Sequence, residues 1–151
     1  MTKKVYLAAR YSRREELCGY RARLQAAGFV VTSRWLNGSH QINAAGTPIG
    51  EDGAALIEEG DDERAAALRR EFVQEDVADV FAADALIAFT EVPRSSTSRG
   101  GRHVELGIAM GRGIHVIVVG PRENLFHWYP GIPAFGSFGA ALRCLQWWAL
   151  R

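Results

Sequence analysis

The stretch ALIAFTEVPRSSTSRGGRHVELGIAMGRGIHVIVVG, residues 85–120, contains the pattern that decides the fold. It begins with an apolar run, residues 85–91, and passes through a loop rich in serine, glycine and arginine. Residues 103–113 then favour a helix, and residues 114–120 form a second apolar run. Runs that are almost continuously apolar are typical of strands buried on both faces of a parallel sheet.

The same alternation of strands and helices precedes this stretch. Residues 4–9 read as a strand, and Ser12 with Glu15 has the spacing of a capping box that would open a helix ended by Gly28. Residues 29–35 read as the next strand. Residues 60–84 have a long helical period, and its apolar face consists of Leu68, Phe72, Val73, Val77, Val80 and Phe81.

The end of the chain completes the pattern with a short fifth strand within residues 133–138 and a last helix over residues 138–151. The sequence therefore predicts an α/β fold in one domain, residues 1–151. We expect a parallel, flavodoxin-like or Rossmann-like sheet of about five strands, with helices on both faces. Residues 36–53 show no clear period, and an irregular loop of this length is usually functional or mobile.

Composition limits the classes of partner. The net charge of +1 gives no global field toward nucleic acid or membranes, and no apolar run reaches the roughly 18 residues of a membrane span. Cys18 and Cys144 are far apart, and the four histidines form no metal-binding pair. We therefore expect a reduced, cytoplasmic protein without a metal or cofactor.

Polar loops follow the predicted strands at the edge where parallel sheets bind ligands. The loops after the first and third strands each enter a helix, and helix N-termini attract anions. These two loops predict a phosphate site built from Arg10, Ser12, Arg13, Ser98, Gly100 and Arg102. The ordinary alternatives are a solvated first helical turn and a flexible linker.

Two carboxylates are candidates for chemistry. Glu105 would suit the start of a helix for electrostatic reasons alone, but it lies among apolar residues at the ligand edge. Asp76 lies on the flank of the apolar face of its helix, so it could point either inward or into solvent. The aromatic residues Phe126, Trp128 and Tyr129 suit a core, a dimer contact or a lid that stacks on a base.

Taken in order, these features resemble the nucleoside 2-deoxyribosyltransferase superfamily over residues 4–129. The resemblance rests on Tyr6 in the first strand, Asp76 before the third strand, and the segments AADALIAF and VELGIA. It implies a homodimer or larger assembly in which Glu105 attacks the anomeric carbon of a nucleoside sugar. It also implies that Tyr6 and Asp76 orient groups around Glu105 or supply a proton.

One departure separates two branches of this superfamily. The base-exchanging transferases carry an Asp shortly before the nucleophile, whereas this chain has no acidic residue between Glu91 and Glu105. It has serines and arginines there, so it looks more like the cytidine 5′-monophosphate hydrolases of nucleoside-antibiotic pathways. That likeness implies CMP or dCMP as substrate, with Arg34 and Trp35 as candidates for contacts to the base. The alternatives are a transferase that exchanges bases between deoxynucleosides and a non-catalytic nucleotide-binding module.

Overall fold

The computed structural model describes residues 1–38, 63–95 and 100–151. Five strands form one sheet: β1 (Lys4–Ala8), β2 (Val30–Val31), β3 (Ala85–Phe89), β4 (His115–Val119) and β5 (Ala134–Phe135). Their order is β2-β1-β3-β4-β5, and every neighbouring pair is parallel. The predicted fold class is confirmed, because this is the strand order of a flavodoxin-like sheet.

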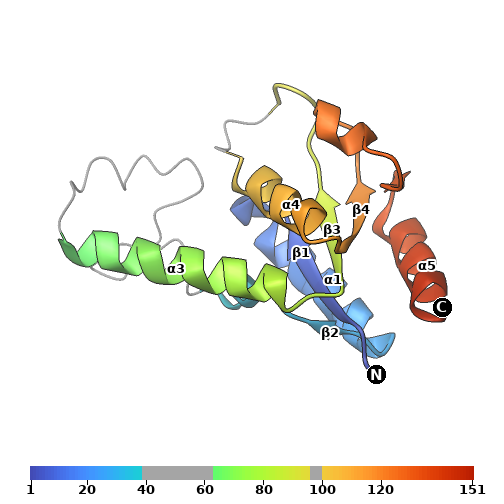
Figure 1. The fold of residues 1–151 in the computed structure, drawn as a ribbon, viewed down its shortest axis with the longest axis horizontal. Coiled ribbons are helices and arrows are strands. Elements are labelled where there is room, and N and C mark those ends of the chain that lie inside the picture. The colour runs from blue at the N-terminus through green and yellow to red at the C-terminus, as the bar shows by residue number, and fades with distance from the viewer. Residues whose placement is uncertain (39–62, 96–99) are drawn as a thin grey trace.

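Helices cover both faces of the sheet (Figure 1). They are α1 (Arg14–Ala26), α3 (Glu63–Phe81), α4 (Gly101–Gly111) and α5 (Phe138–Ala149). Helix α4 packs on β1, β3 and β4, with α3 beside it. On the opposite face, Tyr20 of α1 stacks on Phe138 of α5 with ring centroids 4.2 Å apart, and on Phe89 of β3 at 5.3 Å. The core therefore lies between the sheet and two helical layers.

The central strands are apolar because both of their faces are covered. All five residues of β3 are buried, as are the last four of β1 and of β4. Burying this apolar surface is the main stabilising contribution, at roughly 25 cal/mol per Å². None of the helices in the described ranges is long and apolar enough to cross a membrane.

The second predicted strand is wrong over most of its length. Pairing ends at Val31, and Arg34–Asn37 form a 3₁₀ turn, η2. Side-chain hydrogen bonds explain this: Thr32 donates to the Asp79 carbonyl (2.9 Å), and Ser33 Oγ accepts the Leu7 N–H (2.6 Å). The Thr32 side-chain bond holds the chain close to α3, and Ser33 Oγ occupies the Leu7 N–H, while the Thr32 backbone N–H still donates to the Val5 carbonyl at 2.9 Å.

The two ends of the first helix differ in how well the sequence indicates them. Ser12 is not the cap, because it lies within a 3₁₀ turn, η1 (Tyr11–Arg13), and α1 begins at Arg14. Gly28 does end the helix, with a positive φ of 88° just after the C-cap residue Ala27. Such a φ is what makes glycine favourable there.

The apolar face predicted for the long helix is only partly correct. Val80 is fully buried, but Val73 and Phe81 are 61% and 48% exposed. The helix extends beyond the sheet at its N-terminal end (Figure 1). The side chain of Leu68 lies outside the described residues, as do residues 39–62 of the irregular loop.

Candidate active site

Tyr6 and Glu105 meet beneath helix α4. Tyr6 lies on β1 and is fully buried, and Glu105 lies one turn into α4 and is partly buried. The Tyr6 hydroxyl donates a hydrogen bond of 2.7 Å to Glu105 Oε1, across 99 positions of sequence. A hydroxyl that donates to a carboxylate fixes both the rotamer and the charge distribution of the carboxylate.

The surroundings of Glu105 favour its protonated form. Burial raises the pKa of Glu105 to about 8, and the nearby charge of Asp76 adds to that shift. The hydrogen bond from Tyr6 and the positive charge of Arg102 oppose the shift and lower the pKa. The pKa of Tyr6 is itself raised well above its usual value, mainly by burial and by the charge of Glu105. Tyr6 therefore stays a hydrogen-bond donor at neutral pH.

Asp76 on α3 is the third member of this cluster. It is partly buried, and burial followed by the charges of Asp79 and Glu75 raises its pKa to about 7. The Asp76 charge raises the pKa values of both Tyr6 and Glu105. One carboxylate oxygen of Asp76, Oδ1, is buried from solvent. Of the two orientations left open by the sequence, the inward one is therefore observed.

Arg34 lies beside the cluster and is held by other carboxylates. Its guanidinium pairs with Asp79 at 2.7 Å and with Glu75 at 3.0 Å. Asp79 is only 5% exposed and also accepts the Arg34 backbone N–H at 2.8 Å. Arg34 therefore lowers the pKa of Asp76 less than burial and its acidic neighbours raise it.

Trp35 occupies a core position. The residue is 5% exposed, and its indole N–H donates to the Leu7 carbonyl at 3.0 Å. Its ring lies 6.1 Å from that of Tyr11. The indole thus supports the end of β1, and its contact to a base stays a prediction.

The loops after β1 and β3 lie next to each other, as the predicted phosphate site requires. Arg13 donates to the Thr90 carbonyl and pairs with Glu91 at 3.2 Å, while its other contact is Glu16 at 2.8 Å. Gly100 caps α4 with a φ of 85°, so the helix begins with backbone rather than a bulky side chain. Arg10 and Ser12 lie in the first of these loops, and Ser98 lies outside the described residues.

Arg102 makes a contact that the sequence did not indicate. Its guanidinium forms two hydrogen bonds with Glu123, at 3.1 and 3.0 Å, and both side chains are over 90% buried. Glu123 belongs to the segment after β4, where the sequence indicates a function only for the aromatic residues. A buried pair of this kind holds the start of α4 against that segment.

A polar network extends from this ion pair. Asn124 Oδ1 accepts the Phe126 N–H, which turns the Asn124 amide nitrogen toward two histidines. That nitrogen lies 3.1 Å from His103 Nδ1 and 3.3 Å from His127 Nε2. Because both ring atoms accept, both imidazoles are neutral, in agreement with pKa values lowered mainly by burial. The sequence carried no periodic signal for this network.

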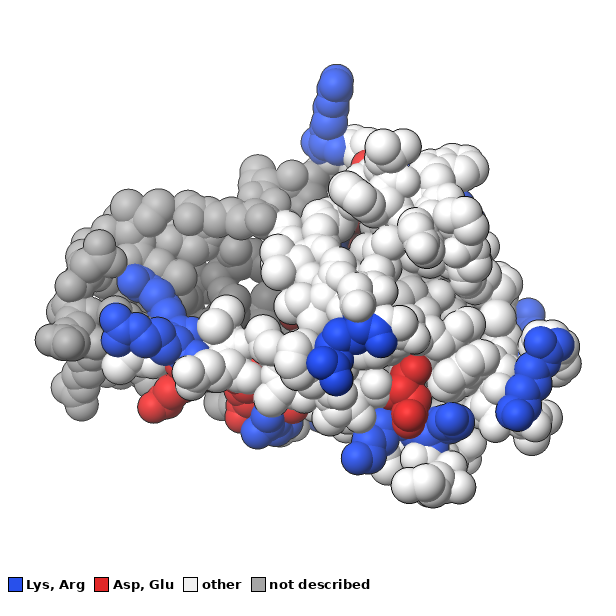
Figure 2. All heavy atoms as spheres, in the orientation of Figure 1, with Lys and Arg blue, Asp and Glu red and all other residues white. Residues whose placement is uncertain are grey.

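The aromatic residues after β4 are not part of the core. Phe126, Trp128 and Tyr129 are 66%, 67% and 59% exposed. Contact with another molecule and a lid over a ligand remain the two interpretations. The face drawn in Figure 2 shows separated basic side chains interspersed with acidic ones, with no continuous basic surface among its described residues.

Comparison with known proteins gives similarity at the level of fold. No family model matches the chain, and no curated protein matches it in sequence. Among solved structures, the chain is similar to the CMP N-glycosidase BcmB of Clostridium botulinum, with a TM-score of 0.56 and 16% sequence identity. The similarity covers 96% of this chain and 99% of that one. The chain thus has the fold of a nucleotide N-glycosidase, which confirms the fold implied by the resemblance in its sequence.

Proposed function

We propose that this chain hydrolyses the N-glycosidic bond of a pyrimidine nucleoside 5′-monophosphate, with CMP as the first candidate. The observation that carries the proposal is the 2.7 Å hydrogen bond between Tyr6 and Glu105, in a cluster completed by Asp76. The fold is shared with a CMP N-glycosidase over almost the whole chain, which supports the same reaction class.

The chemistry needs one carboxylate and one acid. Cleavage of the glycosidic bond places positive charge on the sugar ring, and the Glu105 carboxylate would attack the anomeric carbon to form a glycosyl ester. The electron pair of the broken bond leaves with the base, which takes a proton from Asp76. Water then hydrolyses the ester, giving ribose 5-phosphate and restoring Glu105, with Asp76 now taking up the proton.

The active form under this mechanism has Glu105 ionised and Asp76 protonated. Both pKa values lie near neutrality, at about 8 for Glu105 and about 7 for Asp76. The rate should fall at low pH because Glu105 gains a proton, and at high pH because Asp76 loses one. Because the two groups interact, the resulting pKa values belong to the pair.

We place the phosphate at the adjoining loops after β1 and β3. Arg10, Ser12 and Arg13 would bind it together with backbone amides near Gly100, and Ser98 stays a further candidate. Arg102 is committed to Glu123, so we assign it an indirect role: it fixes the start of α4 and lowers the pKa of Glu105. Phosphate binding is remote from the broken bond, so its energy can hold the sugar over Glu105.

Product analysis tests this proposal against its alternatives. CMP is incubated with the chain, with and without a second pyrimidine base. A hydrolase yields cytosine and ribose 5-phosphate in both cases. A transferase yields a new nucleotide or nucleoside containing the added base, whereas a module that only binds nucleotides yields no product.

A further inference from the structure

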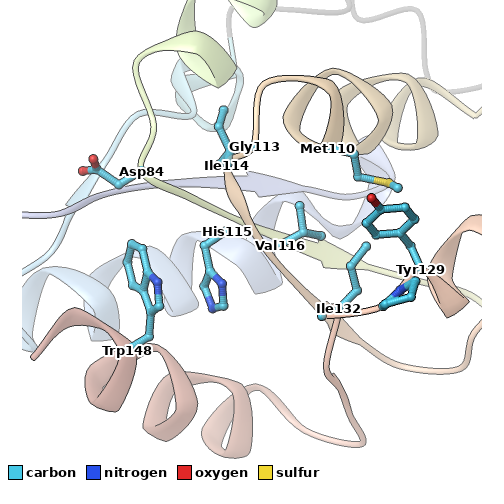
Figure 3. A pocket seen from close by; sticks show the side chains of 11 residues that line it. Asp84, Met110, Gly113, Ile114, His115, Val116, Tyr129, Ile132 and Trp148 are labelled. Atoms are coloured by element: carbon cyan, nitrogen blue, oxygen red, sulfur yellow. The ribbon is translucent and has the colours of Figure 1, made fainter. Parts of the chain in front are cut away.

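A cavity lies at the opposite end of β4 from the predicted phosphate loops. It has a volume of about 430 Å³, within the range of small-ligand pockets. Figure 3 shows it along the edge of β4, with Met110 and Tyr129 on one side of the strand and His115 and Trp148 on the other. The cavity thus lies between the two helical layers, where the sheet has an open edge.

The register of the sheet identifies which backbone groups face this cavity. The His115 N–H donates to the Asp84 carbonyl, on the β3 side. The N–H and C=O groups of successive residues point to alternate sides of a parallel strand, so those of Val116 point away from β3 and toward the β5 side. The Val118 N–H points to the same side, where it donates to the Pro133 carbonyl. Pairing with β5 starts only at Val118, and no described strand pairs with Val116 on that side.

Two residues explain why pairing stops there. Gly131, two residues before Pro133, would be next to pair with β4, but its φ of 89° is not that of an extended strand. Pro133 has no N–H to offer the Val116 carbonyl. The edge therefore presents the Ile114 carbonyl and the Val116 N–H two residues apart, as an acceptor beside a donor.

The walls of the cavity restrict the class of ligand. The imidazole of His115 lies flat on the Trp148 indole, with centroids 4.7 Å apart and planes 7° apart, and burial lowers the His115 pKa. The described lining contains no lysine or arginine, and its carboxylate is Asp84. The Lys3 ammonium lies over the Trp148 ring, 5.0 Å from its centroid, and is not part of the lining. A flat ring would contact the side chains of Met110, Tyr129 and Ile132.

From this geometry we infer that the cavity binds an uncharged planar heterocycle that carries an N–H donor next to an acceptor. Free pyrimidine bases belong to this class, whereas the phosphate of a nucleotide would meet the Asp84 carboxylate and no lysine or arginine of the described lining. The ring would donate to the Ile114 carbonyl and accept from the Val116 N–H, completing the pairing that β5 leaves out. This inference does not depend on Glu105 or on the proposed reaction.

An amide NMR titration of the full-length ¹⁵N-labelled chain tests the inference, with uracil as ligand and 1,3-dimethyluracil as control. Uracil should shift the Val116 amide resonance saturably. Dimethyluracil has the same ring and carbonyls but no N–H, so it should bind at least about tenfold more weakly, because the Ile114 carbonyl would stay unsatisfied.

Two variants of neighbouring exposed aromatic residues make the test specific. Tyr129→Ala removes part of the wall and should weaken uracil binding roughly three- to tenfold. Trp128→Ala removes a ring that does not line this cavity and should leave the affinity unchanged. The inference is overturned if the Val116 resonance does not move, if dimethyluracil binds as tightly as uracil, or if Tyr129→Ala has no effect.

Discussion

Carboxylates of two kinds lie on neighbouring elements of this protein. Asp79 and Glu123 are largely buried, and each bonds an arginine directly. Asp76 lies three residues from Asp79 on the same helix, and yet burial and like charges dominate its environment. Glu105 is similar, since its nearest strong contact is a neutral tyrosine hydroxyl.

The difference separates the carboxylates that bind arginines from the two that we propose to react. We call Asp79 and Glu123 the outer pair because they lie outside the cluster of Tyr6, Asp76 and Glu105, which contains the inner pair. Each outer carboxylate binds an arginine: Asp79 links η2 to α3, and Glu123 links the start of α4 to the segment after β4. The inner pair, Asp76 and Glu105, keeps raised pKa values, as groups that exchange protons near neutral pH require. The following substitutions test this division between the two pairs, in order of decreasing expected effect.

Replacing the inner glutamate should have the greatest effect on turnover. Glu105→Ala removes the proposed nucleophile, and we expect kcat for CMP hydrolysis to fall by about three orders of magnitude or more. Circular dichroism would verify the fold, and Glu15→Ala, a change to an exposed glutamate on α1, serves as the matched control. Near-normal cytosine release by folded Glu105→Ala would contradict the division between inner and outer carboxylates.

Replacing the inner aspartate should change the pH profile as well as the rate. The wild-type rate should pass through a maximum between about pH 7 and 8, given pKa values of about 7 for Asp76 and about 8 for Glu105. Asp76→Asn should lower kcat by about 10²–10⁴ and remove the decline at high pH, because no acid is left to deprotonate. Glu71→Gln, at an exposed position of the same helix, should keep both limbs.

The phosphate contacts should affect substrate preference more than chemistry. We expect kcat/KM to be much higher for CMP than for cytidine, and Arg13→Ala to lower kcat/KM for CMP about ten- to a hundredfold. The same variant should leave kcat/KM for cytidine nearly unchanged, because cytidine has no phosphate to lose. An equal loss for both compounds would place Arg13 in a structural role through Glu16 and Glu91.

A smaller effect concerns stability and its dependence on pH. Burial favours protonated Glu105 and raises its pKa from 4.5 to about 8. The contribution of this group to the free energy of unfolding is therefore complete below about pH 4.5 and is lost as pH rises through about 8. Glu105→Gln stays neutral and should avoid the loss. The melting temperature of Glu105→Gln minus that of the wild type should increase over this range and level off above it. A constant difference would mean that Glu105 is not buried as described.

The fold was predictable from the sequence because its signals are local. β3 is apolar throughout, β4 is apolar after His115, and Gly28 marks the end of α1 through its own backbone conformation. The early end of β2 was not predictable, because it depends on Thr32 and Ser33 bonding to groups far away in sequence.

The candidate site was predictable only in part. The sequence around Glu105 and Asp76 makes each a local candidate, but only the resemblance to a family motif groups them with Tyr6, since no periodicity brings together residues 99 positions apart. The bond from Arg102 to Glu123 depends on how the segment after β4 folds back onto α4, so Arg102 gave the same signal as an arginine that faces a ligand. Likewise, the apolar composition around Trp35 could not distinguish a core indole from one that stacks on a base.

The most direct test of the division between nucleophile and acid uses a substrate whose leaving group needs no proton, such as p-nitrophenyl ribose 5-phosphate. We predict that Asp76→Asn cleaves this compound at close to the wild-type rate, because the proton it can no longer supply is not required. Glu105→Ala should stay as slow as it is on CMP, because the attack on the anomeric carbon is still missing. If both variants are equally slow on this substrate, Asp76 is not the acid, and the assignment of separate roles to the two inner carboxylates is wrong.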